Sequence, residues 1–187
     1  MLEVQTPPGA VVVHDENAVG WASLAMENVM GWTPEEADLC NQSDIAGIFV
    51  LDSVIGNSDR HSDNVLVADP DDNPKRVYSI DVANAWLGDP EGFLGHGLDL
   101  QEVIPGNFLR GASRGLVESH ARPFLERCRV LSTEGGRLER LVSETHSWTG
   151  LVDEEERSML AQALRARLAE CDALLFGLLD RTLGRSS

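Results

Sequence analysis

The sequence predicts an α+β fold, with short strands in the first 81 residues and helices from about residue 113 onward. Two apolar runs, 10–13 and 19–27, flank a polar turn and predict a first β-hairpin. Two more, 64–68 and 76–81, flank a turn rich in Asp and Pro and predict a second hairpin. From residue 113, apolar residues recur with helical spacing. The helical part is the larger one.

Length and composition bound the organisation of the chain. Its 187 residues suit one domain or two unequal lobes, and we place the boundary between 1–31 and 32–187. An apolar content of 42% is enough for a buried core. The first residues lack the pattern of a secretory signal, and no run of 18 apolar residues predicts a membrane span. Three cysteines without CxxC spacing favour a reducing, cytoplasmic location.

Capping signals locate the helices that follow the first hairpin. Thr33 precedes Pro34, which suits the first position of a short helix. A second helix is expected over 44–56, with Ser43 or Asp44 as its N-cap. Apolar residues cover more than one face of this second helix, so it should be buried.

The second half of the chain divides into an irregular and a helical segment. Residues 82–112 are rich in Gly and Pro and show little periodicity, which in a compact domain is typical of functional segments. The clearest helix is expected over 153–183, because acidic residues fill its first turn and Gly184 follows its end.

The charge of the chain restricts its partners. The formal net charge is −16, which repels a phosphate backbone and an anionic membrane surface. We therefore expect no nucleic-acid partner, and a basic peptide substrate fits better than a lipid. Lys75 is the single lysine of the chain.

One polar run carries the chemistry. Asp59, Arg60, His61 and Asn64 follow the predicted buried helix, and Asp81 ends the second hairpin. Phosphoryl transfer needs a carboxylate facing the attacking hydroxyl and oxygen ligands for magnesium. A hairpin from 64 to 81 would bring an amide oxygen and a carboxylate to one edge. This pattern predicts a site for phosphoryl transfer.

The spacing Asp59-x-x-x-x-Asn64 resembles the catalytic loop of protein kinases. The order Asp-Arg-His resembles the phosphatidylinositol 3- and 4-kinases, and the fuller Leu-Asp-x-x-x-Gly-Asn-x-Asp-Arg-His-x-x-Asn string resembles bacterial HipA-like kinases. The resemblance implies a protein-kinase-like fold, mostly its helical large lobe with a two-stranded remnant of the small lobe and a catalytic hairpin. It implies ATP and Mg²⁺, with Asp59 as base and Asn64 and Asp81 as metal ligands. Arg60 and His61 would brace the loop or assist catalysis.

The resemblance extends upstream but is incomplete. Met26, Glu27, Asn28 and Val29 resemble the hinge whose backbone holds adenine. A Gly-rich loop and a small-lobe lysine have no room before the first strand, and Lys75 lies inside the second hairpin. Four explanations stay open: a split enzyme whose partner chain supplies the small lobe, a truncated sequence, an arginine in place of the lysine, or binding without catalysis.

Three functions follow from these observations. The first is a kinase that moves the ATP γ-phosphate to a hydroxyl, on a protein in preference to a lipid. The second is a pseudokinase or regulatory binding subunit, and the third a metal-dependent phosphohydrolase. In each, Asp52 is expected to brace the loop and Asp63 to face water.

Overall fold

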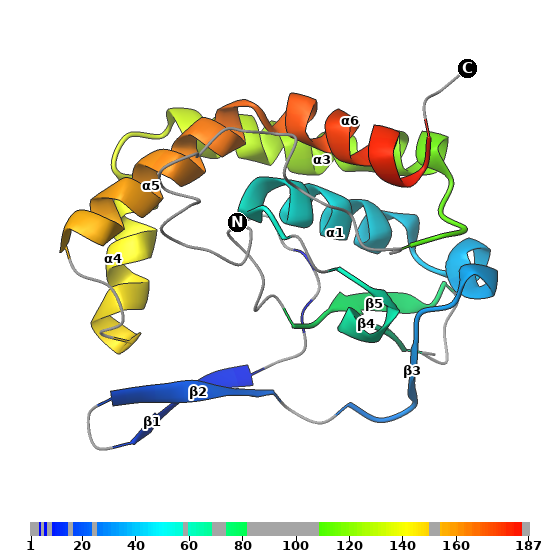
Figure 1. Ribbon diagram of the computed structural model, residues 1–187, viewed down its shortest axis with the longest axis horizontal. Coiled ribbons are helices and arrows are strands. Elements are labelled where there is room, and N and C mark those ends of the chain that lie inside the picture. The colour runs from blue at the N-terminus through cyan, green and yellow to red at the C-terminus, as the bar shows by residue number, and fades with distance from the viewer. Residues whose placement is uncertain are drawn as a thin grey trace.

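The computed structural model describes the backbone over residues 4, 6, 9–14, 17–23, 26–57, 60–68, 74–81, 109–149 and 154–184. Within these ranges the chain is α+β and mostly helical, which confirms the predicted fold class at that level. The helices form the upper part of the molecule and the strands lie below them (Figure 1).

A three-stranded antiparallel sheet carries the predicted second hairpin. Its order is β3 (Val29–Gly31), β4 (Val65–Ala68) and β5 (Arg76–Ser79). In the β4–β5 pair, Val67 lies opposite Val77 on the buried face, and Leu66 lies opposite Tyr78 on the other face. Apolar side chains thus point inward at every second position. The predicted hairpin is confirmed, but its strands are shorter than the predicted 64–68 and 76–81.

The predicted first hairpin is confirmed, with a shorter second strand. Strands β1 (Gly9–His14) and β2 (Asn17–Ser23) pair antiparallel in a sheet of their own. The second strand was predicted to run to residue 27, which is wrong, because β2 ends at Ser23. Strand β3 was not predicted at all. Its three residues carry no alternation, and it exists only because β4, 34 residues later, pairs with it.

Helix α1 (Gln42–Ile55) is the buried centre of the fold, as predicted. Its N-cap is Asn41, whose side-chain oxygen accepts hydrogen bonds from the backbone N–H groups of Ser43 (3.0 Å) and Asp44 (3.3 Å). The prediction of Ser43 or Asp44 as the cap is therefore wrong. Asp44 instead binds the guanidinium of Arg76 and accepts the N–H of Val77, which ties the start of α1 to β5.

Four helices follow the described part of the irregular segment: α3 (Arg114–Thr133), α4 (Arg137–Thr149), α5 (Glu154–Ala169) and α6 (Cys171–Thr182). The single helix predicted over 153–183 is therefore two helices, which meet at Glu170. Because the chain changes direction there, α6 lies along α1 while α5 packs against α4 (Figure 1). Gly184 follows with a left-handed φ of 80°, as its predicted role requires. Of the described helices, none has the length and apolar content to span a bilayer.

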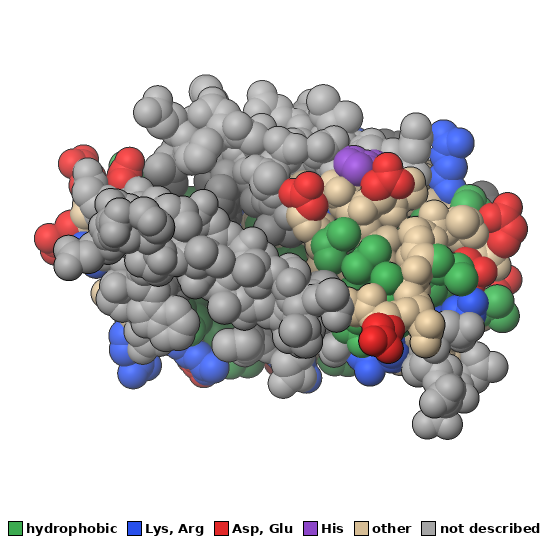
Figure 2. Space-filling view, turned by 90° about the horizontal axis from the view of Figure 1, so that it is seen from below, with side chains coloured by type: hydrophobic (Ala, Val, Ile, Leu, Met, Phe, Trp, Pro, Cys, Tyr) green, Lys and Arg blue, Asp and Glu red, His purple; other side chains and the backbone are tan. Residues whose placement is uncertain are grey.

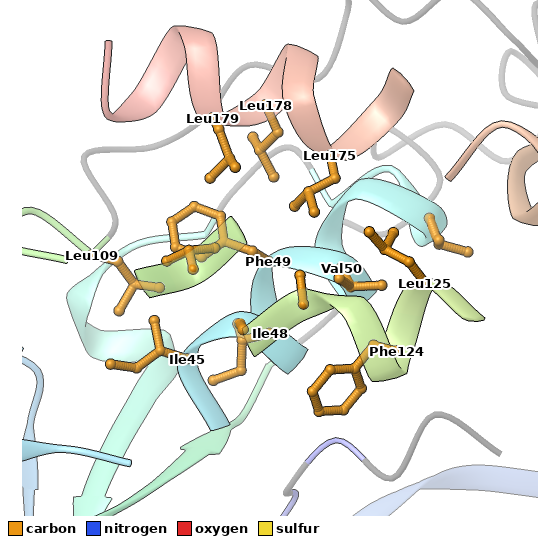
Figure 3. Close-up of a cluster of buried hydrophobic side chains, with 14 of the residues drawn as sticks. Ile45, Ile48, Phe49, Val50, Leu109, Phe124, Leu125, Leu175, Leu178 and Leu179 are labelled. Carbon is orange, nitrogen blue, oxygen red and sulfur yellow. The ribbon is translucent and has the colours of Figure 1, made fainter. Parts of the chain in front are cut away.

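The core lies between α1 and the helices above it. In Figure 3, Ile45, Ile48, Phe49 and Val50 of α1 meet side chains of α3 and α6. On the other side of α1 lie the inward residues of the sheet, so α1 separates two apolar layers. A helix contacted on both sides needs apolar residues around most of its circumference, which explains the absence of a polar face in its sequence.

The end of the irregular segment packs against the short 3-10 helix η1 (Pro34–Leu39). Leu109 and Gly111 both adopt left-handed backbone conformations, with φ of 54° and 93°. A Cβ atom added at Gly111 would lie 2.5 Å from the carbonyl oxygen of Pro34. Backbone therefore touches backbone here, and only glycine meets both requirements.

We predict that Gly111→Ala lowers the free energy of unfolding by about 2–4 kcal/mol, because the new methyl group adds a backbone clash to a strained φ. Gly115→Ala is the matched control, since a Cβ atom there meets nothing within 4 Å. Urea unfolding followed by circular dichroism measures both. Equal stability of the two variants would contradict this account of the contact.

Candidate functional site

The polar run begins where α1 ends. Gly56 terminates the helix with a left-handed φ of 62°, and its N–H bonds to the Asp52 carbonyl oxygen. Asn57 then donates from its backbone N–H to the Asp52 carbonyl oxygen (3.0 Å) and from its side chain to the Asp52 carboxylate (3.0 Å). Asp59, the predicted base, lies outside the described residues, so its role and its proximity to Asp81 stay predictions.

Arg60 is the central side chain of the described site. Its Nε and Nη2 atoms bind the two carboxylate oxygens of Asp52, each at 2.8 Å. Its Nη1 atom donates to the carbonyl oxygens of Asn64 (2.8 Å) and Ile80 (2.7 Å). Nη2 also donates to the Ser79 hydroxyl at 2.8 Å. These five bonds match the five N–H groups of a guanidinium, so Arg60 braces the loop and supplies no donor to a phosphate.

The Asp52–Arg60 pair is buried. The two residues are 3% and 2% exposed, so neither charge is solvated by bulk water. Burial raises the pKa of the Asp52 carboxyl, and the hydrogen bonds and charge of Arg60 act against that rise. The bidentate geometry and the additional bond from Asn57 keep a carboxylate tolerable at this depth. The prediction that Asp52 braces the loop is confirmed.

The two predicted metal ligands come from adjacent points of the backbone. The Asn64 carbonyl oxygen accepts the N–H of Ile80 at 3.0 Å, and Arg60 donates to both of these residues. Asp81 is the next residue, exposed at the end of the β5 segment with a left-handed φ of 47°. Such a conformation is uncommon for a residue other than glycine, although Asp tolerates it better than most. The structure therefore brings Asn64 and Asp81 together, as the hairpin prediction required.

His61 and Asp63 lie beside this site and differ in exposure. His61 is half-buried, and its Nδ1 atom lies 3.9 Å from a carboxylate oxygen of Asp63. The Asp63 side chain is 88% exposed, which confirms that it faces water. His61 also accepts the N–H of Asn64 through its carbonyl oxygen, at 3.0 Å. A catalytic role for His61 stays a prediction.

The predicted adenine segment leads into the sheet. Met26 is half-buried, and Glu27 and Asn28 are exposed. Val29, which we placed in the first of the two predicted regions (1–31), begins β3 and lies opposite Ala68 of β4. The segment therefore joins the sheet that carries Asn64, at the opposite end of β4. The division of the chain at residue 31 stays a prediction.

An apolar surface adjoins the site on the outer side of the sheet. Leu66 and Tyr78 form a cross-strand pair there, and both are half-buried. Gly31 lies opposite Leu66 on β3, and a Cβ atom added to it would meet nothing within 4 Å. Figure 2 shows hydrophobic side chains gathered on this underside, with acidic side chains around them. This surface includes Leu66 of β4, the strand that directly follows Asn64.

Two contributors to the site were not foreseen from the sequence. Ser79 is buried on β5 and accepts a hydrogen bond from Arg60. Its place on the inward face, two residues before Asp81, was the available signal. Arg167 contacts the end of α1 from 113 residues away, and no local pattern marks it.

Lys75 is excluded from this arrangement. It begins the approach to β5, and its ammonium group binds Glu36 of η1 at 2.7 Å. This placement agrees with the expectation that it is not a phosphate-binding lysine. Among the described residues, no three His, Cys, Asp or Glu side chains form a group that could hold a metal by themselves.

We predict that Arg60→Met lowers the free energy of unfolding by about 3–5 kcal/mol, because it leaves the Asp52 carboxylate buried without its cation. The double variant Asp52→Leu/Arg60→Met should recover much of this loss, since no charge then remains buried. Arg129→Met, which breaks an exposed ion pair with Asp172, is the control and should change little. Urea unfolding measures all three. A loss at Arg60 no larger than at Arg129 would refute the bracing role.

Comparison with known proteins assigns no relative to this chain. No family description, curated protein or solved structure matches it.

Proposed function

We propose that this chain is a kinase-like phosphotransferase of the HipA-like or phosphatidylinositol-kinase-like type, which moves the ATP γ-phosphate to a hydroxyl group. The observation that carries the proposal is the Arg60 hub, which holds Asn64 and Ile80, the neighbour of Asp81, by hydrogen bonds of 2.7–2.8 Å. An amide and a carboxylate at one sheet end, after a braced polar loop, are what metal-assisted phosphoryl transfer requires. The net charge of −16 favours a hydroxyl on a basic protein over an anionic lipid.

Asn64 and Asp81 fit magnesium in type and number. Magnesium prefers oxygen ligands and is commonly held by one or two protein side chains together with substrate phosphates. Asp81 is exposed, so phosphate groups can approach its carboxylate. When bound, the metal ion would neutralise charge on the phosphate oxygens. The chain itself contributes the close approach of the two backbone segments that carry these residues, through the bond between Ile80 and Asn64.

The apolar surface of the sheet supports a nucleotide lying along β4. From Asn64 to Ala68 the strand rises about 13 Å, at ~3.3 Å per residue. The metal ligands lie at one end of this distance, and Val29, the last residue of the adenine segment, lies at the other. Leu66 and Tyr78 offer an apolar surface between these two ends, with open space beside it at Gly31. Such a face suits a planar base, and the backbone of 26–29 would supply its polar contacts.

Asp59 is the proposed base, with His61 beside it. Asn57 and Arg60, the described residues on either side of 58–59, are both 3% or less exposed and both bind the Asp52 carboxylate. The described residues on either side of the proposed base are therefore held by one carboxylate. Positioning of catalytic groups contributes on the order of 7–11 kcal/mol to reactions of this kind.

A second function, nucleotide binding without catalysis, is favoured by one specific observation. Kinases place a lysine on the phosphates, and here the only lysine binds Glu36. The five N–H groups of Arg60 all donate to acceptors of its own chain. A phosphate-binding cation must then come from another arginine or from a partner chain. A small-lobe partner would restore catalysis, and without one the chain would act as a pseudokinase or regulatory subunit.

We predict that Asp81→Asn weakens the binding of ATP in the presence of Mg²⁺ by about tenfold or more, since even the loss of outer-shell groups costs 10- to 100-fold in metal affinity. Asp63→Asn removes an equal charge from the exposed neighbour of Asn64 and should leave binding unchanged. Isothermal calorimetry with and without Mg²⁺ measures both. Equal affinities of Asp81→Asn and the unsubstituted chain would remove Asp81 from the metal site.

We predict that phosphate transfer from radiolabelled ATP to Ser-containing basic peptides is slow or absent with the isolated chain and increases when a polypeptide carrying a Gly-rich loop and a lysine is added. Asp59→Ala should abolish the restored rate, and Asp63→Asn should preserve it. Robust transfer by the isolated chain would contradict the need for a partner. ATP and Mg²⁺ binding without transfer under any pairing would favour the pseudokinase.

A further inference from the structure

Arg167 is a buried arginine on α5, far from the site in sequence. It is 1% exposed and is the largest by volume of the fully buried side chains among the described residues. Its Nε atom donates to the carbonyl oxygen of Val54 and its Nη2 atom to that of Ser53, both at 2.6 Å. Burial lowers its pKa to about 10, so the guanidinium remains charged at neutral pH.

The two carbonyl groups belong to the last turn of α1, where a helix leaves its carbonyl oxygens without intrahelical partners. The Asp52 carbonyl is already used by the N–H groups of Gly56 and Asn57. Arg167 donates hydrogen bonds to the next two carbonyl oxygens, those of Ser53 and Val54. Its positive charge lies at the negative end of the helix dipole. It therefore caps α1 from another helix.

This cap stabilises the last turn of α1, which is followed by the polar loop, described at residues 57 and 60–64. Asp52, whose side chain binds both Asn57 and Arg60, immediately precedes Ser53. A shift or fraying of the last turn would move the Asp52 carboxylate, and with it the two residues that flank 58–59. The connection runs through contacts on every step: Arg167 to Ser53 and Val54, Asp52 to Arg60, and Arg60 to Asn64.

We propose that Arg167 is a positioning residue for phosphoryl transfer, which fixes the end of α1 so that the polar loop and its metal ligands stay in register. The inference rests on the proposed function for its catalytic part. The matched comparison is Arg165, on the same helix, which binds Glu139 at the surface.

The experiment compares Arg167→Met, Arg167→Lys and Arg165→Met with the unsubstituted chain of 187 residues. Amide hydrogen exchange by NMR follows the N–H groups of Asn57, Asn64 and Ile80 in the site and of Val117 in α3, each relative to global unfolding. Phosphate transfer is measured with ATP, Mg²⁺, basic peptides and, where needed, the small-lobe polypeptide.

We expect Arg167→Met to lower protection of the three site amides, with that of Val117 unchanged, and to lower kcat about 10- to 100-fold with KM for ATP within about twofold. Arg167→Lys keeps the charge but lacks the planar guanidinium that binds both carbonyl oxygens, so its protection and kcat should be intermediate. It remains informative if the Met variant does not fold. Uniform loss of protection, or values like those of Arg165→Met, would overturn the proposal. Local loss of protection without any transfer by the unsubstituted chain would retain the positioning of the loop and refute the phosphotransferase.

Discussion

The arrangement of the site depends on the Arg60 guanidinium, which joins three separate segments of the chain. Through five hydrogen bonds it connects Asp52 of α1, the carbonyl of Asn64 before β4, and Ser79 and Ile80 at the end of β5. Four of these bonds are buried and the bond to Ile80 is partly buried, so they satisfy acceptors that would otherwise be costly to remove from water. Because a guanidinium is planar and rigid, these acceptors are held in one relative geometry.

Helix α1 supports this hub because both of its ends are fixed by polar contacts while its middle is apolar. Asn41 caps its start, Asp44 binds Arg76 on β5, and Arg167 takes the carbonyl groups of its last turn. Between these anchors the helix packs against α3 and α6 on one side and the sheet on the other (Figures 1 and 3). The apolar packing supplies stability, and the polar anchors determine the axial position from which Asp52 reaches the loop.

Charge explains why a site of this form would depend on metal and on a partner. The Asp59, Asn64 and Asp81 pattern lies in a chain of net charge −16, and ATP is itself an anion. Arg60 is neutralised by Asp52 and Lys75 by Glu36, so neither relieves the repulsion. Magnesium on the phosphates and a cation from elsewhere would do so, because opposite charges nearby favour the bound anion.

The sequence alone determined the elements whose signals are local. The apolar runs at 64–68 and 76–81 predicted the second hairpin, whose strands are 65–68 and 76–79, and apolar residues on more than one face predicted a buried α1. The spacing from Asp59 to Asn64 predicted phosphoryl transfer, which stays a proposal. Tertiary structure decided what depends on distant contacts. Strand β3 exists because β4 pairs with it, and the turn at Glu170 separates the directions of α5 and α6. Arg167 is buried because the end of α1 offers it two carbonyl oxygens, a partner that no periodicity in its own helix could indicate.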